Sequence, residues 1–402
     1  MREVNIVYIC DNDFIVPTIT SVNSLKAYRE KSVKYNVYII VSSSSIIEER
    51  LYKDISEPFF RVVFLDAEGI ENENTEKLIN VPDVSAKYVT KAALFKFLLA
   101  DILDDIDKVL YIDGDTIIQS SLCNLFDIDI SEKYVAAVPD MGCYYPDLID
   151  HTGRLNFGNE FYFNSGVMLL NLSKMREDNV SKALVDYRMN YKNNYMDQDA
   201  LNYVLGKSAY RLPIEYNTLT LTVLNKSQDE LIELFSINTI EELLDRSKIL
   251  HTAGALKPWI YNIPWVTERF YKYCPESGLD IFPVQKLKSP FYLYKKESSA
   301  DRKDWAFPYS LIPKGSRVVL YGCGIVGETL KKQNDYTGYC NIVAWADKRS
   351  SVSGEGIIKP ESICDKKYDL ILIAVADRKK QETIKNELIS LGNNEDTIVV
   401  LP

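Results

Sequence analysis

Two aspartates separated by a single glycine, Asp113 and Asp115, directly follow the apolar run 109–112. Such a run is typical of a short buried strand, and residues two apart on a strand project to the same side, roughly 6.5–7 Å apart. Gly114 lets the backbone bend between them, so that both carboxylates can converge on one point. Carboxylates at the carboxyl end of a buried strand suit Mg²⁺ or Mn²⁺ together with phosphate oxygens. The motif therefore predicts a metal–diphosphate site, and its structural alternative is a plain Asp-Gly turn.

Polar side chains also follow or interrupt apolar segments elsewhere in the chain. Acids that directly follow a strand stand where ligand-binding groups lie in open α/β sheets. Each of these residues also has a structural alternative: a helix-capping acid, a solvated lysine, an amide that satisfies buried backbone, or an exposed loop histidine. In chain order they are Asp11 and Asp13 after the run 4–10, Lys96 in a helical stretch, Asp140 after 135–138, Asn164 within 161–172, Asp197, Gln198 and Asp199 at a helix start, and His251, Gly254 and Lys257 in a segment with glycine and proline.

The composition of the chain bounds its class. Its 402 residues leave room for about two or three domains, and 46% hydrophobic with 26% charged residues is the balance of a globular protein. The net charge of -10 argues against a nucleic-acid binder, which would need a basic face. The seven cysteines include no Cys-x-x-Cys pair and no run approaches 18 apolar residues, so we expect a cytoplasmic protein with reduced thiols and no transmembrane segment.

The order of the apolar segments predicts an α/β protein. Strands that alternate with amphipathic helices are typical of a parallel sheet with helices on its faces. In this arrangement the acid pair ends one strand of the sheet, and the glycine-containing segment 251–259 forms a loop. The predicted strands are 4–10, 35–42, 61–65, 109–112, 135–138 and 161–172, and the predicted helical segments are 17–28, 46–52, 83–106, 174–192, 197–205 and 225–250.

A second α/β pattern begins near residue 310. A strand at 317–321 leads into Gly322-x-Gly324-x-x-Gly327 and a helix, and the next strand ends in Asp347. This is the context of the dinucleotide-binding fingerprint. The segment of about 90 residues suffices for one mononucleotide-binding half, and no Tyr-x-x-x-Lys pair follows. A structural or acceptor-docking module is therefore favoured over an NAD(P)-dependent oxidoreductase.

Later segments complete this second pattern and define the expected domains. Further strands are predicted at 368–375 and 397–401, with a helix at 378–391 between them. The expected organisation is a catalytic domain at 1–265, a helical and aromatic extension with a linker at 266–309, and a Rossmann-like α/β domain at 310–402.

The motifs of the first 265 residues, taken together and in order, resemble the retaining glycosyltransferases of family 8. The matching segments are Ile-Val-Tyr-x-x-Asp11-Asn12-Asp13, Lys96, Tyr-Ile-Asp113-Gly-Asp115-Thr, Phe-Asn164-Ser-Gly166-Val-Met-Leu-Leu-Asn171, Asp197-Gln198-Asp199-x-Leu-Asn202 and His251-x-x-Gly254-x-x-Lys257-Pro-Trp259. The resemblance implies a GT-A fold, and the two-domain chain is similar to bacterial enzymes that glycosylate serine-rich repeat adhesins.

The resemblance implies both a reaction and a set of binding residues. The reaction is Mn²⁺-dependent transfer of a hexose, galactose in preference to glucose, from a UDP-sugar to a glycan hydroxyl on a protein, with an α-linkage formed. Mg²⁺ is the second choice of metal. Asp113, Asp115 and His251 would hold the metal. The donor nucleotide and its diphosphate would contact Ile9, Asp11, Asp13, Lys96, Asp113, Gly114, Asp115, His251, Gly254 and Lys257.

The same resemblance places Asp140, Asn164, Asp197 and Gln198 around the donor sugar. Glutamine is a poor nucleophile, so we favour substitution from the front face of the sugar, while double displacement through Gln198 or Asp197 stays open. A protein of another class, a non-catalytic partner of a second glycosyltransferase, is a further alternative. Several aromatic residues are expected either to stack on an acceptor sugar or to fill the core: Tyr144, Tyr145, Phe161, Tyr162 and Trp259.

Overall fold

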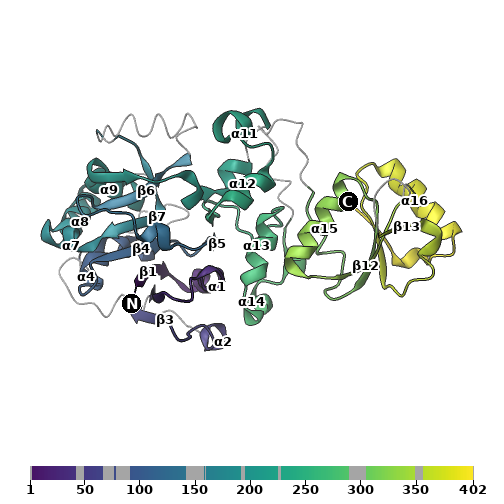
Figure 1. Cartoon of the computed structure of the whole chain (residues 1–402), viewed down its shortest axis with the longest axis horizontal. Coiled ribbons are helices and arrows are strands. Elements are labelled where there is room, and N and C mark those ends of the chain that lie inside the picture. The colour runs from purple at the N-terminus through teal and green to yellow at the C-terminus, as the bar shows by residue number, and fades with distance from the viewer. Residues whose placement is uncertain are drawn as a thin grey trace. The chain divides into compact units, whose positions relative to one another are not determined.

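The computed structural model describes most of the chain, which divides into two compact units (Figure 1). One unit comprises Met1–Lys257 with Tyr273–Gly278, and the other comprises Pro258–Lys272 with Leu279–Pro402. Parts of the segments expected at 46–52, 83–106 and 286–303 lie outside the described residues, as do Tyr144 and Tyr145. The described residues are 2–41, 49–66, 77, 91–141, 158, 160–191, 195–224, 228–288, 305–348 and 356–401.

A seven-stranded sheet, in the order β3-β2-β1-β4-β7-β6-β8, forms the centre of the first unit. Every predicted strand of this region is confirmed. The strands from β3 to β4 are parallel, but β7 runs antiparallel to both β4 and β6, so the expectation of a wholly parallel sheet is wrong. The strands are β1 (Glu3–Cys10), β2 (Lys34–Val41), β3 (Phe60–Asp66), β4 (Lys108–Ile112), β6 (Val135–Pro139), β7 (Phe163–Asn171) and β8 (Ala209–Arg211).

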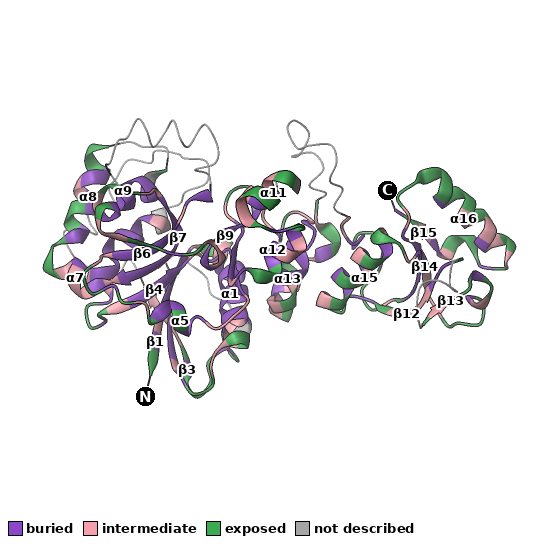
Figure 2. Ribbon diagram, turned by 45° about the horizontal axis from the view of Figure 1, so that its top comes forward, coloured by how far each residue is buried: buried purple, intermediate pink, exposed green. Residues whose placement is uncertain are grey.

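The middle of this sheet is buried on both faces, and β4, β6 and β7 are almost entirely buried in Figure 2. Two predicted helices are shorter than expected. The segment 174–192 is two helices, because Asn179 adopts a left-handed conformation with φ 52° between them. The described part of 83–106 is a 3₁₀ helix followed by one α-helical turn that ends at Ile102. The helical elements concerned are η2 (Lys91–Leu98), α4 (Leu99–Ile102), α7 (Leu172–Glu177) and α8 (Val180–Asn190).

Other helical elements of the first unit lie between its strands in the chain. The helix predicted at 17–28 begins two residues earlier, and the one at 197–205 begins one residue earlier. The described part of 225–250 is two helices and a strand. These elements are η1 (Asn12–Phe14), α1 (Ile15–Tyr28), α2 (Glu49–Tyr52), α5 (Cys123–Phe126), α9 (Met196–Leu205), η4 (Gly206–Ser208), η5 (Ile214–Tyr216), α10 (Thr220–Leu224), α11 (Gln228–Phe235) and α12 (Ile240–Arg246).

A second, three-stranded sheet brings distant parts of the first unit together. It consists of β5 (Thr116–Ile118), β10 (Ile249–His251) and β9 (Thr218–Leu219), with β10 in the middle. β10 runs antiparallel to β5 and pairs His251 with Thr116. His251 therefore ends a strand rather than standing in a loop. Two- and three-residue strands are too short to show the alternation that would predict them.

The second unit contains a five-stranded parallel sheet in the order β13-β12-β11-β14-β15. Alternate residues of β11 enter two different core clusters, one on each face of the sheet, as expected for a parallel sheet. The predicted strands are confirmed with slightly shorter ends, and the two-residue β13 was not predicted. Two helices, α13 (Val266–Tyr273) and α14 (Glu276–Ile281), have residues in both units. The other elements of the second unit are η6 (Val284–Lys286), β11 (Arg317–Tyr321), α15 (Ile325–Thr337), β12 (Asn341–Ala346), β13 (Ile357–Ile358), η8 (Pro360–Ser362), β14 (Leu370–Ile373), α16 (Arg378–Ser390), η9 (Glu395–Thr397) and β15 (Ile398–Val400).

The structure bears on two further points, membrane-spanning helices and the state of the cysteines. In the part that the structure describes, no helix is long and apolar enough to cross a membrane. The six cysteines among the described residues are free thiols.

Glu268 in the second unit is a fully buried acid. Burial raises the pKa of its carboxyl to about 7, although the hydrogen bond donated by the Tyr309 hydroxyl at 3.0 Å and the charge of Arg269 act in the other direction. Among the described residues, its Oε2 atom has no hydrogen-bond partner. The folded chain therefore binds a proton at Glu268 more tightly than the unfolded chain does.

We expect this proton to make folding stability depend on pH. Because the folded pKa is above the ordinary value of 4.5, the contribution of Glu268 to stability is greatest at low pH and decreases by about 3 kcal/mol as the pH rises from about 4.5 to about 7. Urea unfolding at several pH values measures this slope. Glu268→Gln keeps an acceptor for Tyr309 and should flatten the slope, whereas Glu361→Gln, at an exposed position, should leave it unchanged. A slope that persists in Glu268→Gln would contradict the assignment.

Candidate metal centre and its polar surroundings

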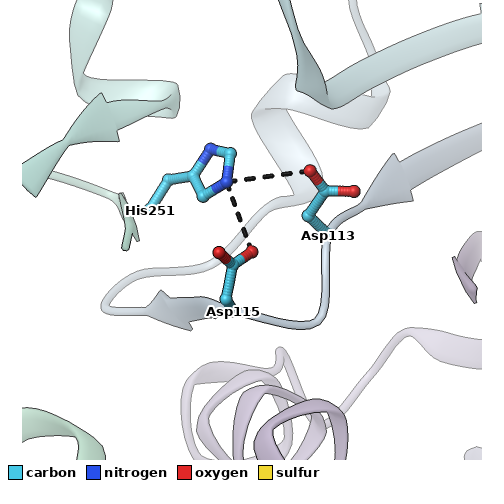
Figure 3. Close-up of side chains that lie close together, drawn as sticks. All are labelled: Asp113, Asp115 and His251. Atoms are coloured by element: carbon cyan, nitrogen blue, oxygen red, sulfur yellow. Dashed lines mark ion pairs between the residues drawn. The ribbon is translucent and has the colours of Figure 1, made fainter. Parts of the chain in front are cut away.

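Three side chains from two strand ends and the turn beside them meet at one point in the first unit. Asp113 directly follows β4, Asp115 precedes β5, and His251 ends β10. The Nε2 atom of His251 lies 3.7 Å from Oδ2 of Asp113 and 3.3 Å from Oδ1 of Asp115 (Figure 3). One ligand atom from each residue lies within 4.8 Å of the others. One imidazole nitrogen and two carboxylate oxygens make a donor set that could hold a divalent cation.

Backbone hydrogen bonds hold these three residues in place. The pairing of β10 with β5 sets His251 opposite Thr116, the residue after Asp115. The carbonyl of Asp115 accepts hydrogen bonds from both the backbone N–H and the hydroxyl of Thr252, each at 2.9 Å. The N–H of Asp113 donates to the carbonyl of Gly166 at 2.8 Å. The sheets therefore fix the directions of all three side chains before any metal binds.

Two glycines leave the space that this arrangement needs. A Cβ atom at Gly166 would lie 2.2 Å from Cε1 of His251 and 2.7 Å from Oδ2 of Asp113. A Cβ atom at Gly114 would lie 2.2 Å from the hydroxyl oxygen of Thr18. Gly114 was expected to serve a backbone bend. Its φ is not positive, so close packing against α1 accounts for the glycine.

Lys257 and Lys96 supply positive charge to this cluster. The ammonium of Lys257 donates to Oδ2 of Asp115 and, at 2.8 Å, to the carbonyl of Thr252. Burial disfavours the charge on Asp115, but Lys257 and His251 outweigh it and hold the pKa of this carboxyl far below its usual range. Asp115 therefore remains a carboxylate.

Lys96 is buried and bridges two acids, so its alternative as a solvated lysine is wrong. Its Nζ atom lies 3.2 Å from Oδ1 of Asp113 and 2.8 Å from Oδ2 of Asp197. Burial opposes the charge, but the two carboxylates outweigh it and raise the pKa of Lys96. Burial likewise opposes ionisation of Asp197, and Lys96 outweighs it and lowers the pKa of Asp197. The bridge joins the metal-binding acids to the next group of residues.

Asp140, Asn164 and Gln198 form a hydrogen-bonded cluster on the other side of Lys96. The Asn164 amide nitrogen donates to Oδ2 of Asp140 at 3.0 Å and to Oε1 of Gln198 at 3.1 Å. The Gln198 amide nitrogen donates to the same Asp140 oxygen at 2.9 Å. Ser165 links this cluster to Asp197, since its backbone N–H donates to Gln198 and its hydroxyl donates to Asp197. The four residues expected around a donor sugar are thus brought together.

Three residues of this region were missed by sequence reasoning. Asn217 donates to Oδ1 of Asn164 at 2.9 Å, and its own Oδ1 lies 2.9 Å from Nδ1 of His251. Tyr111 donates to Asp113, and burial together with Asp113 raises the pKa of Tyr111 well above its usual value. Ser165 was passed over inside an apolar strand. No spacing signal could have found Asn217, because it stands in an irregular segment after η5.

Two asparagines of the matched motifs have structural tasks. Asn202 exchanges hydrogen bonds with the backbone of Phe163 and so fastens α9 to β7. Asn171 caps α7 by accepting from the N–H of Lys174 at 3.0 Å. These contacts explain the motif positions without a ligand.

The residues expected at the nucleotide lie at the carboxyl end of β1 and in the loop after β10. Asp11 caps η1, since its Oδ1 accepts from the N–H of Phe14 at 3.3 Å. The ring of Phe14 lies 5.5 Å from the Lys257 ammonium, which brings this turn beside the metal cluster. Asp13 and Gly254 are exposed, and Ile9 is buried.

Of the aromatic residues, Trp259 packs in the core of the second unit, 5.3 Å from the ring of Phe270. Tyr162 donates to Asp199 at 2.6 Å, and Phe161 is half-buried beside Phe163. Core packing therefore accounts for Trp259.

In the second unit the glycine motif links β11 to α15 as predicted: Gly322 and Gly324 lie between the two elements, and Gly327 lies in the first turn of α15. The N–H of Cys323 donates to Oδ2 of Asp347 at 2.9 Å, and the Trp345 indole donates to the carbonyl of Gly322 at 2.8 Å. The acid at the end of β12 thus binds the glycine loop itself.

Known proteins resemble this chain in sequence and in fold. A family model described as "Glycosyl transferase family 8" matches residues 5–262, and one described as "C2185-like, N-terminal" matches residues 314–399. A solved structure of the galactosyltransferase LgtC, in complex with donor and acceptor sugar analogues, superposes with a TM-score of 0.53 at 21% identity. The superposition covers 67% of this chain and 95% of that one, and it shows likeness of fold.

Curated relatives are similar over parts of the chain. General stress protein A of Bacillus subtilis (strain 168) is 29% identical over 197 residues, which cover 47% of this chain and 66% of that protein, just under two thirds. Glycosyltransferase GlyF of Streptococcus pneumoniae is 25% identical over 314 residues, 75% of this chain and 68% of its own length. Lipopolysaccharide 1,3-galactosyltransferase of Salmonella typhimurium is 27% identical over 271 residues, 63% of this chain and 72% of its own length.

Proposed function

The chain belongs to glycosyl transferase family 8 and has the GT-A fold, and we propose that it transfers a hexose from a UDP-sugar to a glycan hydroxyl on a protein. The transfer depends on Mn²⁺, with Mg²⁺ as second choice, and keeps the α-configuration of the sugar. The observation that carries the proposal is the meeting of Asp113, Asp115 and His251 at the end of the central strands. The donor set of one nitrogen and two oxygens fits Mn²⁺.

The residues on the metal side of the site can neutralise the negative charge of the leaving group. A cation held by Asp113, Asp115 and His251 would neutralise charge on the diphosphate. Lys257 stands beside Asp115 with its ammonium half-buried, where it can balance the charge that develops on the departing UDP. Exposed Gly254 leaves room for phosphate near the backbone.

Ile9, Asp11 and Asp13 are proposed to bind the uridine, and Gly114 to allow its approach. Their position at the carboxyl end of β1, beside Phe14 and Lys257, supports this assignment. A UDP-binding measurement with Asp11→Ala tests it, and unchanged affinity would remove Asp11 from the site.

Asp140, Asn164, Asp197 and Gln198 are proposed to surround the donor sugar. Both ends of the Gln198 amide are already hydrogen-bonded, and Asp197 is held by Lys96 and Ser165. These restraints favour front-face substitution over attack by either side chain. The bond from the anomeric carbon to the diphosphate oxygen breaks while the acceptor oxygen bonds from the same face, and the acceptor proton passes to the departing phosphate oxygen. A sugar trapped covalently on Gln198 or Asp197 would overturn this mechanism.

The choice of galactose over glucose depends on how one sugar hydroxyl is hydrogen-bonded. Relatives named as a galactosyltransferase and as a glucosyltransferase are about equally similar to this chain, so the preference for galactose rests on the family resemblance. The resemblance to adhesin-glycosylating enzymes favours a glycan on a serine-rich protein as acceptor.

For the segment 310–402 we infer a Rossmann-like domain that serves as a structural or acceptor-docking module, following the catalytic domain 1–265 and the extension 266–309. When its five strands are numbered from 1 to 5 in the order of the chain, their order in the sheet is 3-2-1-4-5, and this order supports a Rossmann-like fold. The oxidoreductase alternative loses support because Asp347, the acid that would bind a ribose, already accepts from the glycine loop. Tight NADH binding by the whole chain would restore it.

The proposed function is tested by measuring UDP release from a panel of UDP-sugars with and without Mn²⁺. We expect slow hydrolysis of UDP-galactose that requires Mn²⁺ and stops when EDTA removes it. Addition of a glycosylated serine-rich peptide should accelerate the release. Metal-independent release would contradict the metal site. Binding of a UDP-sugar without turnover, with or without the peptide, would favour the non-catalytic partner instead.

A further inference from the structure

Asn217 stands between two groups of side chains, and its own side chain is completely buried. The metal cluster is Asp113, Asp115 and His251, and the sugar-side cluster is Asp140, Asn164, Asp197 and Gln198. Its Oδ1 atom lies 2.9 Å from Nδ1 of His251, and its amide nitrogen donates to Oδ1 of Asn164 at 2.9 Å. Both ends of this amide are therefore engaged, one with a predicted metal ligand and the other with a residue of the sugar-side cluster.

Two backbone donors on β7 fix the direction of the whole hydrogen-bond chain. The N–H of Gly166 donates to Oδ1 of Asn164 at 3.0 Å, so this atom is an oxygen and the other end of the Asn164 amide donates. The N–H of Ser165 donates to Oε1 of Gln198 at 3.1 Å and fixes that amide in the same way. Since Oδ1 of Asn164 can only accept, Asn217 must present its nitrogen to it and its oxygen to His251.

This direction decides which nitrogen of His251 carries the proton. The oxygen of Asn217 can only accept, so Nδ1 of His251 is the protonated nitrogen and donates to it. A histidine that ligates a metal must be neutral, and its lone pair would then lie on Nε2, the atom that faces Asp113 and Asp115. A metal ligand is commonly oriented by such a hydrogen bond at its other ring nitrogen.

We propose that Asn217 is a positioning residue that holds His251 as a metal ligand and couples it to Asn164 of the sugar-side cluster. The proposal rests on the proposed function. Asn217 is not among the residues proposed to hold the metal or the sugar, and it acts through His251 and Asn164. Its two contacts are chemically different, so substitutions can separate them.

Two substitutions at this position test the two contacts. Asn217→Ala removes both, whereas Asn217→Asp keeps an oxygen acceptor for Nδ1 of His251 and loses the donor to Asn164. We expect Mn²⁺ affinity, measured by electron paramagnetic resonance titration of the whole chain, to fall about 10- to 100-fold in Asn217→Ala. Asn217→Asp should bind Mn²⁺ at least as tightly as the wild type. At saturating Mn²⁺, its kcat for UDP-hexose hydrolysis should nevertheless fall about tenfold, because the bond to Asn164 is lost.

Ser247→Ala serves as the matched control. Ser247 is buried near the same small sheet, and its hydroxyl donates to Thr218 at 2.7 Å, outside the hydrogen-bond chain described above. Its substitution should lower the unfolding temperature without changing Mn²⁺ affinity. Wild-type affinity in Asn217→Ala, or equal losses in Asn217→Ala and Asn217→Asp, would overturn the role of Asn217 alone. A wild-type chain that binds no Mn²⁺ would overturn the proposed metal-dependent function and this inference with it.

Discussion

Asp115→Ala is expected to reduce Mn²⁺-dependent UDP release about a thousandfold, because a lost metal ligand removes several kcal/mol of transition-state stabilisation and each 1.36 kcal/mol is tenfold in rate. One oxygen of Asp115 faces His251 at 3.3 Å and the other binds Lys257. The substitution therefore removes a metal ligand and releases the lysine that would meet the leaving group. Mn²⁺ titration and initial rates on the same preparations separate these two effects.

The design needs variants that distinguish lost chemistry from lost folding. Asp115→Asn keeps the size of the side chain and should fold, while its neutral amide should still impair Mn²⁺ binding. Asp107→Asn is the matched control, because Asp107 lies one residue before β4 with its side chain 87% exposed. Retained metal-dependent turnover in both Asp115 variants would mean that this acid does not bind the metal.

Lys96→Met is expected to destabilise the fold by about 3–5 kcal/mol, the usual cost of leaving a buried charge without its partner. The side chain of Lys96 is 4% exposed, and its ammonium is shared by Asp113 and Asp197. UDP release should also fall sharply, because two carboxylates that face the donor would repel each other and the diphosphate. Urea unfolding and UDP-release assays measure the two effects independently.

The double variant Lys96→Met with Asp197→Asn sharpens this test. Removing the Asp197 charge as well should restore part of the lost stability but none of the activity. Lys182→Met provides the control, because Lys182 is 63% exposed and pairs with Asp186 along a helix surface, where a salt bridge contributes about 0.3–0.5 kcal/mol. A Lys96→Met protein as stable as the Lys182→Met control would contradict the importance of the bridge.

Two separate links thus connect the proposed metal-binding residues to the residues proposed to surround the sugar. Lys96 joins Asp113 to Asp197 by ion pairs, and Asn217 joins His251 to Asn164 by hydrogen bonds. Each link begins at a different metal ligand. A substitution on the sugar side is therefore expected to change metal affinity, and this expectation follows from connected contacts rather than from distance alone.

The sequence by itself determined six of the seven strands of the large sheet, all but β8, and the residues at the ends of several of them. Apolar runs that stop at acids are local features, and they located β1, β4 and β6 together with Asp11, Asp113 and Asp140. The strand, glycine turn and helix at 317–337 were likewise local and correctly predicted. The joint use of Asp113, Asp115 and His251 was expected only from the family resemblance, because nothing local connects residues so far apart in the chain.

Only the tertiary structure decided strand direction and side-chain partnership. Alternation of apolar residues is the same in a parallel and an antiparallel strand, so β7 could not be oriented from its sequence. Judged by its place on the helix alone, Lys96 looked like a surface lysine. Its charge can be buried because β4 and α9 bring two acids, Asp113 and Asp197, to its ammonium. Asn217 matters because β9 and β10 lie side by side and place it against His251. Such contacts depend on where separate elements pack, and this is set by the burial of their apolar faces rather than by the polar residues themselves.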